Sequence, residues 1–196
     1  MEFSQTELLS FFTEVSPFVR NLVIGLFAFG EGLPVIGSFL PGGTVAILIG
    51  ALSEKGIMNS WHAVHIIALG SMLGDLIGFY AGRNLNKVSW FKRFVHGENH
   101  RKKWDLFDRH TAIVIILGKL LPVIRSTPAL FAGARRMNIF RYIFYVLIGS
   151  YLWAIAGVFA GKYIAQVAGD YIIPVIFAIV VVSILVAIVS RFKKSS

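Results

Sequence analysis

Long uncharged apolar runs alternate with short basic segments along the chain. Residues 142–161 and 171–190 each contain 20 consecutive residues without a charge. As α-helices, such runs would cross the roughly 30 Å hydrocarbon core of a bilayer. Residues 63–80 form a third apolar run, which is interrupted by one acid, Asp75. The pattern predicts an all-α polytopic membrane protein, because a helix satisfies its backbone hydrogen bonds internally.

Two further apolar regions, 18–52 and 111–134, are broken in the middle by residues that interrupt helices. The breaks contain Pro34, Pro41, Gly42, Gly43, Pro122 and Pro128. Each region therefore predicts two arms that enter the membrane and return on the same side. In the second region each arm would contain about 12 residues and reach roughly mid-membrane. We expect the irregular backbone at that depth to be buried in protein or to line a wet cavity.

The basic residues predict the topology. Fourteen of the 19 Lys and Arg lie in three clusters, at 83–109, 135–141 and 191–194. The excess of Lys and Arg in cytoplasmic segments places all three clusters, and the C-terminus, in the cytoplasm. Residues 111–134 then have two cytoplasmic flanks, so a re-entrant hairpin fits them better than one crossing. The first hairpin should enter from the outer side.

Composition agrees with this class. The chain of 196 residues is 56% hydrophobic and 15% charged, against about 25% charged in soluble domains. The net charge of +9 is clustered in the manner of a membrane surface, so we expect no nucleic-acid partner. The absence of cysteine excludes disulfides and thiolate metal sites. No nucleotide loop or catalytic constellation is visible, so we expect neither an enzyme nor a cofactor.

The two broken regions resemble each other. Residues 30–38 and 118–126 are identical at six of nine positions, and residues 70–83 match 149–162 in two blocks that follow in the same order. Arg83 lies at the predicted inner end of its span and Lys162 at the outer end, so the repeats are inverted. Inverted repeats with interrupted helices are typical of secondary transporters.

The predicted organisation is a single membrane domain. It comprises an N-terminal interfacial segment (1–20), repeat one (21–83), a basic cytoplasmic loop (84–110), repeat two (111–162) and an extra C-terminal transmembrane helix (170–190). Each repeat is a re-entrant helical hairpin followed by a transmembrane helix. Gly70, Gly74, Gly78 and Gly82 recur every four residues, which predicts a close-packing stripe on one helix.

Four ionisable residues lie in apolar surroundings: Glu31, Asp75, Lys119 and Arg125. An unpaired charge in hydrocarbon costs several kcal/mol, so each should face a partner or a cavity. One interpretation is a set of structural ion pairs that joins the hairpin tips. The other is an anion site built from Arg125 and Lys119, with Glu31 and Asp75 as proton or cation carriers. Asp75 could instead reach the basic interface.

The second break is suited to an anion. Thr127 followed by Pro128 predicts an N-cap and a first helical position, so the returning arm would begin near mid-membrane with its positive dipole end exposed. Arg125 precedes this point, and its planar fork matches a phosphate or a carboxylate. We therefore expect Ser126 and Thr127 to line the site beside Arg125 and Lys119.

The chain resembles the DedA family of membrane proteins, also described by the VTT or SNARE-associated domain. The resemblance covers about residues 25–165. It rests on Glu31, Pro34, Pro41-Gly42, Gly74-Asp75-x-x-Gly78-x-x-x-Gly82-Arg83, Pro122-x-x-Arg125, Ala132-Gly133-x-x-Arg136-Met137 and Gly149-x-x-x-Trp153. The resemblance implies two re-entrant hairpins, movement of lipids between leaflets, and functional roles for the Glu31 acid and for Arg125. Bacterial members resemble proton-motive-force-dependent translocases of undecaprenyl phosphate or phosphatidylethanolamine, and eukaryotic relatives act as scramblases.

The chain departs from the family pattern at three positions. Gly43 stands where an acid is common, Lys119 replaces an arginine and Val146 replaces an asparagine. Lysine keeps the charge but loses bidentate binding. The missing acid leaves Glu31 and Asp75 to carry any proton coupling.

The leading hypothesis is a flippase in the inner membrane that moves an anionic phospholipid or polyprenyl phosphate, such as undecaprenyl phosphate, coupled to the proton motive force. Its partners would be membrane lipids and protons or another coupling cation. The alternatives are a proton-coupled small-ion transporter, a passive lipid scramblase and a membrane scaffold acting through its basic loop. The sequence leaves the lipid, the direction of transport and the oligomeric state open, including a homo-oligomer.

Overall fold

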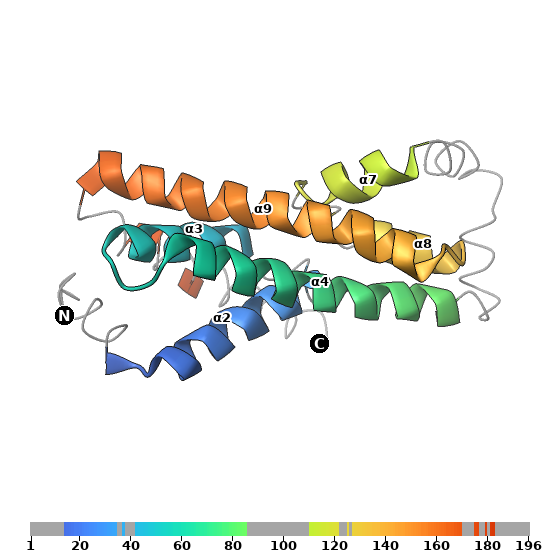
Figure 1. The fold of residues 1–196 in the computed structure, drawn as a ribbon, viewed down its shortest axis with the longest axis horizontal. Coiled ribbons are helices and arrows are strands. Elements are labelled where there is room, and N and C mark those ends of the chain that lie inside the picture. The colour runs from blue at the N-terminus through green and yellow to red at the C-terminus, as the bar shows by residue number, and fades with distance from the viewer. Residues whose placement is uncertain are drawn as a thin grey trace, which may run out of the picture.

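The computed structural model describes residues 14–34, 37, 42–85, 110–121, 125, 127–169 and the positions 175, 176, 179, 181 and 182. Every element in these ranges is a helix (Figure 1), which confirms the predicted all-α class for the described part of the chain. The helices are α2 (Pro17–Gly32), α3 (Gly42–Glu54), α4 (Ser60–Leu85), α7 (Thr111–Gly118), α8 (Thr127–Ala134) and α9 (Ile139–Ala168).

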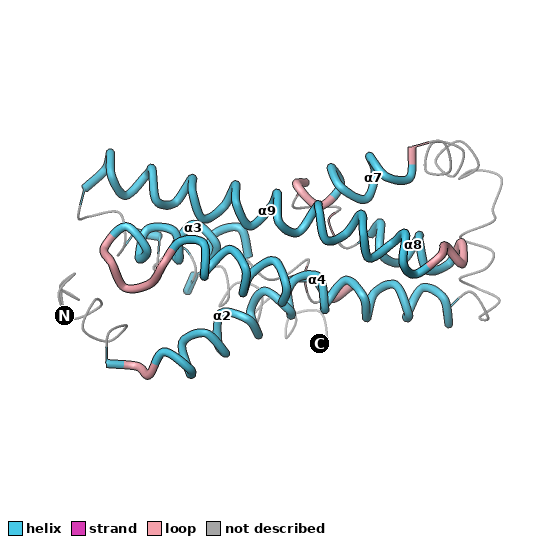
Figure 2. The backbone as a smooth tube through the Cα atoms, viewed as in Figure 1, coloured by secondary structure: helices cyan, strands magenta, loops and turns pink. Residues whose placement is uncertain are grey.

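Helices α4 and α9 form the centre of the structure. They have 26 and 30 residues, and the segments Ser60–Asn84 and Ile139–Ala168 are long and apolar enough to cross a membrane. They contain the spans predicted from the apolar runs at 63–80 and 142–161. The two helices pack against each other and run in opposite directions along the long axis of the molecule (Figure 2).

The two broken regions each form a pair of helices. Helix α2 begins at Pro17, where the Ser16 hydroxyl accepts a hydrogen bond from the Val19 amide at 3.3 Å, and α3 follows the break after Gly32. Helices α7 and α8 have eight residues each, so the second pair is shorter than the arms of about 12 residues predicted from 1.5 Å of rise per residue.

Several predictions fall outside the described residues. They concern most of the C-terminal helix at 170–190, the basic loop from 86 to 109, residues 1–13, the break residues Pro41 and Pro122, and the predicted binding residue Ser126.

The glycine stripe on α4 brings backbones into contact, as predicted. A methyl group at Gly70 would lie 2.6 Å from the Gly25 carbonyl oxygen of α2, and one at Gly78 would lie 3.1 Å from the Ala129 Cβ of α8. Neither space would hold a side chain without a shift of the neighbour. Gly74 and Gly82 make the corresponding contacts with the backbones of α2 and α8.

Helix α9 uses its glycines in the same way. Gly149 packs against the Ile116 backbone of α7, whereas a methyl group at Gly157 would lie 2.7 Å from the Ala46 Cβ of α3. Helix α4 therefore packs on α2 and α8, and α9 packs on α7 and α3.

A buried polar layer divides the apolar core into two clusters. The first cluster joins residues of α2, α3, the start of α4 and the end of α9, and the second joins Phe79, Ile115, Ala129, Ala132, Tyr142 and Val146. Along α4, Ser71 and Asp75 lie between residues of the two clusters, and along α9 Ser150 lies between Val146 and Ala154. The polar layer thus lies at mid-length of both long helices.

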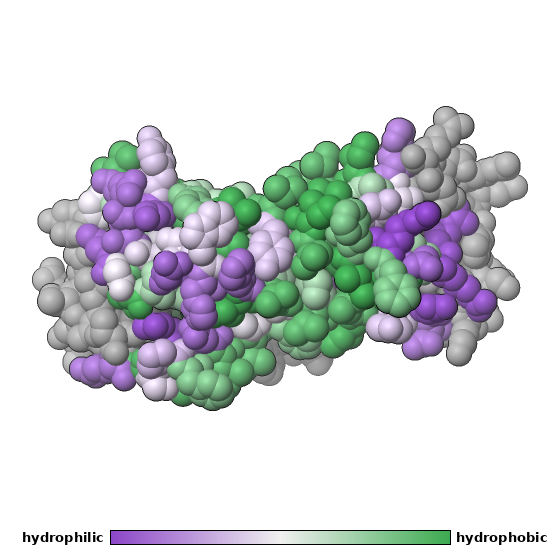
Figure 3. Space-filling view, viewed as in Figure 1, coloured by the Kyte–Doolittle hydropathy of each residue, from purple (hydrophilic) through white to green (hydrophobic). Residues whose placement is uncertain are grey.

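The outer surface is apolar over the same middle zone. Figure 3 shows hydrophobic residues gathered across the middle of this face and hydrophilic residues toward its two ends. Large apolar side chains of α4 such as Leu69, Leu73 and Ile77 are about half exposed. Contiguous apolar surface of this kind marks contact with a membrane or a partner, and lipid tails would cover it here.

The glycine contacts predict a sharp difference between two alanine substitutions. Gly161→Ala would place a methyl group against the Ile47 backbone and should lower the free energy of unfolding by about 1–3 kcal/mol. Gly25→Ala is the matched control, because its methyl group would lie at an ordinary 3.6 Å from Ile66 and alanine favours the helix. Thermal unfolding in detergent measures both. Equal stability of the two variants would contradict the packing described here.

Candidate functional site

The four ionisable residues meet in two ion pairs inside the polar layer. Arg125 Nη1 pairs with Glu31 Oε1, and Lys119 Nζ pairs with Asp75 Oδ2. All four side chains are buried, with exposed fractions of 2–6%. The sequence alignment placed Glu31 opposite Lys119 as equivalent positions of the repeat, whereas in the structure each contacts a different partner.

The Glu31–Arg125 pair joins the tips of the two broken regions. Glu31 lies in the last turn of α2, where unpaired carbonyls give the helix end a partial negative charge. A carboxylate there needs a nearby cation. Arg125 lies two residues before the start of α8, whose N-terminus is partially positive. Each charge therefore sits at the helix end that disfavours it and is stabilised by the other.

Three elements hold the Arg125 guanidinium. Besides the contact with Glu31 of α2, its Nη2 donates to the Ser71 hydroxyl of α4 at 3.3 Å. On α9, the Trp153 ring covers it, with the guanidinium carbon 4.8 Å from the ring centroid. This distance is typical of a cation–π contact. These three contacts fix the plane and the orientation of the Arg125 guanidinium.

The Asp75–Lys119 pair joins α4 to the end of α7. Lys119 follows Gly118, the last residue of α7, where a cation is favoured by the helix dipole. The Tyr142 hydroxyl donates to the Asp75 carbonyl oxygen at 3.3 Å, and its ring stacks on Phe79. Asp75 is buried beside Lys119 instead of reaching the interface.

The other predicted site residues divide into two groups. Pro34 packs against Gly78 of α4 and Gly43 against Trp153 of α9, so these two break residues lie against the central helices, whereas Pro128 packs against Gly118 at the end of α7. Thr127 is half-buried at the start of α8, and Gly42 begins α3. Arg83 and Arg136 are exposed and are not part of the buried charge layer.

Two buried serines contribute to the polar layer without having been predicted as site residues. Ser71 and Ser150 are both fully buried, and only Ser71 contacts one of the four charges. The repeat alignment of residues 70–73 with 149–152 placed these serines at equivalent positions, which was the available signal. The contact of Trp153 with Arg125 could not be read from spacing, because it depends on how α9 crosses the second break.

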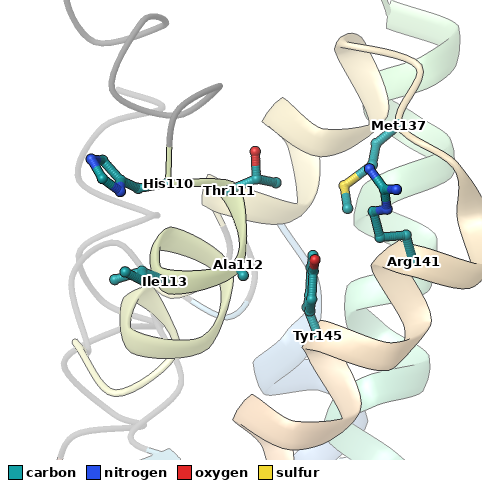
Figure 4. A pocket seen from close by; sticks show the side chains of 7 residues that line it. All are labelled: His110, Thr111, Ala112, Ile113, Met137, Arg141 and Tyr145. Atoms are coloured by element: carbon teal, nitrogen blue, oxygen red, sulfur yellow. The ribbon is translucent and has the colours of Figure 1, made fainter.

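A cavity of about 370 Å³ lies apart from the charges, between the start of α7 and the first turns of α9. It is lined by His110, Thr111, Ala112, Ile113, Met137, Arg141 and Tyr145. Figure 4 shows Met137 and Arg141 facing Thr111 and Ala112 across the opening, with Tyr145 between them. None of the four buried charges lines this cavity.

Breaking one buried pair should cost far more than breaking a surface pair. Asp75→Asn leaves the Lys119 ammonium without its counter-ion and should lower the free energy of unfolding by about 3–5 kcal/mol. Adding Lys119→Met to that variant should restore most of the loss, because no charge then remains buried. Glu54→Gln is the control, since the partly exposed Glu54–Lys162 pair at 3.6 Å should contribute at most about 1 kcal/mol.

Thermal unfolding in detergent, followed by circular dichroism, compares the three variants with the wild type. A Glu54→Gln loss as large as that of Asp75→Asn would show that burial does not distinguish the two pairs.

The chain is similar to several membrane proteins of bacteria. It is 29% identical over 150 residues to an uncharacterised membrane protein of Buchnera aphidicola, a match that covers 74% of this chain and 57% of that protein. It is 25% identical over 187 residues to the protein DedA of Escherichia coli, covering 89% and 84%. It is also 29% identical over 175 residues to the E. coli inner membrane protein YabI, covering 83% and 66%.

The chain therefore spans little more than half of the Buchnera protein and about two thirds of YabI. No solved structure matches the chain. Residues 40–163 match the family described as the VTT domain, a range that includes three of the four buried charges. Together with the resemblance to DedA and YabI, this match shows that the chain belongs to the DedA family of VTT-domain membrane proteins.

Proposed function

We propose that this membrane protein is a flippase that moves a lipid with an anionic phosphate head group, such as undecaprenyl phosphate, between the leaflets of the inner membrane, coupled to protons. The observation that carries the proposal is the buried Glu31–Arg125 pair, which lies between the tips of the two broken regions. A charge pair at this depth, in a protein of this family, fits a transport pathway better than a purely structural role.

The pair explains how a phosphate and a proton would be coupled. Glu31 occupies the Arg125 fork that a phosphate oxygen would also take, so the two anions compete for one cation. When the lipid phosphate displaces Glu31, the buried carboxylate loses its counter-ion at the negative end of α2. Desolvation then favours protonation of the carboxylate. Release of the phosphate would restore the pair and release the proton.

The second pair supplies a further cation and acid. Lys119 follows α7, six residues before Arg125 in the same broken region, and carries a point charge that a phosphate can share. Asp75 would hold Lys119 while the site is empty. The proposal thus assigns phosphate binding to Arg125 and Lys119, assisted by Thr127 and Ser126, and proton coupling to Glu31 and Asp75.

The helix packing supports inverted repeats with re-entrant hairpins. Gly70 and Gly149, equivalent in the repeat, pack against the first arms α2 and α7, and Gly78 and Gly157 pack against the second arms α8 and α3 of the opposite repeat. Helices α7 and α8, with eight residues each, span about 12 Å. That is less than half of the roughly 30 Å hydrocarbon core, so neither arm would cross it alone.

The proposed topology can be tested with single cysteines, because the sequence contains none. Lys55 lies in the exposed turn between α3 and α4, and Asn84 is exposed near the other end of α4. A membrane-impermeant maleimide added to intact spheroplasts should label Lys55→Cys and leave Asn84→Cys unlabelled until the membrane is opened. The cysteine-free parent is the control for background. The reverse labelling pattern would invert the topology proposed from the basic clusters.

Translocation itself is tested in proteoliposomes with labelled lipid phosphate, with and without a pH gradient. Arg125→Ala should abolish translocation, because it removes the fork that holds the phosphate in the proposed site, and Arg125→Lys should restore only part of it. Glu31→Gln should lose the response to the pH gradient. Lys162→Ala, which removes a partly exposed cation at 3.6 Å from Glu54, is the matched control and should behave as wild type.

The outcomes separate the alternatives. Translocation that ignores both the gradient and Glu31→Gln would identify a passive scramblase. Unchanged translocation by Arg125→Ala would contradict the site. Absence of lipid movement, together with gradient-driven ion flux, would identify a small-ion transporter instead.

A further inference from the structure

Two buried hydrogen-bond donors on α9 have no partner within the part of the chain that the structure describes. They are the Ser150 hydroxyl and the Trp153 indole Nε1–H. Buried polar groups in native proteins are nearly always paired, so an orphan needs an explanation such as an absent ligand. Ser53 shows the usual case, because its buried hydroxyl donates to the Ile49 carbonyl oxygen at 2.8 Å.

Trp153 places one of these donors beside the candidate anion site. Its ring covers the Arg125 guanidinium at 4.8 Å. Gly43 lies against the benzene edge of this ring, where a methyl group on Gly43 would be 3.1 Å from Cη2 and 3.4 Å from Cζ2. Cζ2 belongs to the edge of the indole that leads to Nε1. Because residue 43 is a glycine, it offers no side-chain acceptor to the indole N–H.

Ser150 lies on the same face of α9 as Trp153. Residues three apart on a helix are neighbours on its surface, and Ser150 is fully buried within the polar layer. Its repeat equivalent, Ser71, already accepts a hydrogen bond from Arg125 at 3.3 Å. Two serines at equivalent positions on α4 and α9 thus belong to the layer that contains Arg125, and only that of α9 lacks a partner.

We propose that Trp153 Nε1 and Ser150 Oγ complete the phosphate site around Arg125 and make it selective for a phosphomonoester head group. The proposal rests on the assignment of Arg125 as the phosphate-binding residue. In it, the guanidinium fork engages two phosphate oxygens, and the two neutral donors, together with Lys119, bind the oxygen that the fork leaves free.

The chemistry of the head group explains the selectivity. A carboxylate or a phosphodiester presents two charged oxygens, which the arginine fork satisfies. A phosphomonoester presents a third, so a site with additional donors gains hydrogen bonds only with the monoester. Neutral donors add these bonds without adding charge, so Glu31 can still return to Arg125 when the phosphate leaves.

The test measures lipid binding separately from transport. Trp153→Phe keeps a ring over Arg125 and removes the N–H, and Ser150→Ala removes only the hydroxyl. Each variant is placed in phosphatidylcholine nanodiscs with increasing phosphatidic acid, a monoester, or phosphatidylglycerol, a diester. Thermal unfolding followed by circular dichroism reports the stabilisation by each lipid. Each variant should bind phosphatidic acid about tenfold more weakly than wild type, with phosphatidylglycerol binding little changed.

The sign of the stability change separates binding from structural roles. Removal of an unpaired buried donor without loss of volume leaves a folded protein as stable as before or more so, so Ser150→Ala in pure phosphatidylcholine should unfold at or above the wild-type temperature. Trp153→Phe also loses the ring atoms that pack against Gly43 and should unfold at a lower temperature, so only its lipid selectivity is informative. Two matched controls should keep normal lipid binding. Ser53→Ala loses a formed hydrogen bond and should be less stable with normal lipid binding. Trp61→Phe removes an indole N–H at an exposed position and should change neither.

Each outcome decides the question. Wild-type binding of phosphatidic acid by both variants, or an equal loss for phosphatidylglycerol, would overturn the proposal. So would destabilisation of Ser150→Ala in pure phosphatidylcholine, since the hydroxyl would then have a protein partner. Wild-type binding of phosphatidic acid by Arg125→Ala would contradict both the phosphate site and the proposed function. Selective loss in the two variants, together with no translocation in proteoliposomes, would support the binding site and contradict transport.

Discussion

The arrangement of this protein depends on bringing four charges together in an apolar interior. An unpaired Glu31, Asp75, Lys119 or Arg125 at that depth would cost several kcal/mol, so the helix or break that carries each residue must contact the element that carries its partner. The pairs Glu31–Arg125 and Asp75–Lys119 therefore fix the second broken region against both α2 and α4. The apolar clusters on either side of the layer pack around this constraint.

The same pairs make the interior suited to exchange. A buried ion pair stabilises a fold only weakly relative to apolar packing, because desolvation offsets most of the attraction. In the proposed mechanism, an anion that brings its own charge to Arg125 would replace Glu31 while this carboxylate takes up a proton, so no unpaired charge would remain buried. Trp153 and Ser71 contact the guanidinium independently of Glu31 and would keep it in place during such a replacement.

Sequence reasoning predicted the elements better than their contacts. The apolar runs at 63–80 and 142–161 predicted α4 and α9, since only length and hydropathy are needed for a span, and the proline and glycine residues predicted the two breaks. The length of α7 was wrong, because this helix ends at Gly118, where Pro128 of the returning arm crosses it. The sequence predicted that the charges would need partners, but it did not predict which. A repeat alignment gives equivalent positions, whereas Glu31 meets Arg125 because of how two tips face each other in space.

The glycine contacts between the long helices and the opposite second arms have a mechanical consequence. Where Gly157 meets Ala46 and Gly78 meets Ala129, the helices touch through small groups. Such surfaces resist separation, because close contact maximises dispersion attraction, yet they offer few steric barriers to sliding along the helix axes. Each long helix also packs between one arm of each broken region, so a hinge movement that separated the two long helices would break many contacts at once. Relative movement by shear, in which α4 and α9 slide past α8 and α3 by small steps, would break fewer of those contacts.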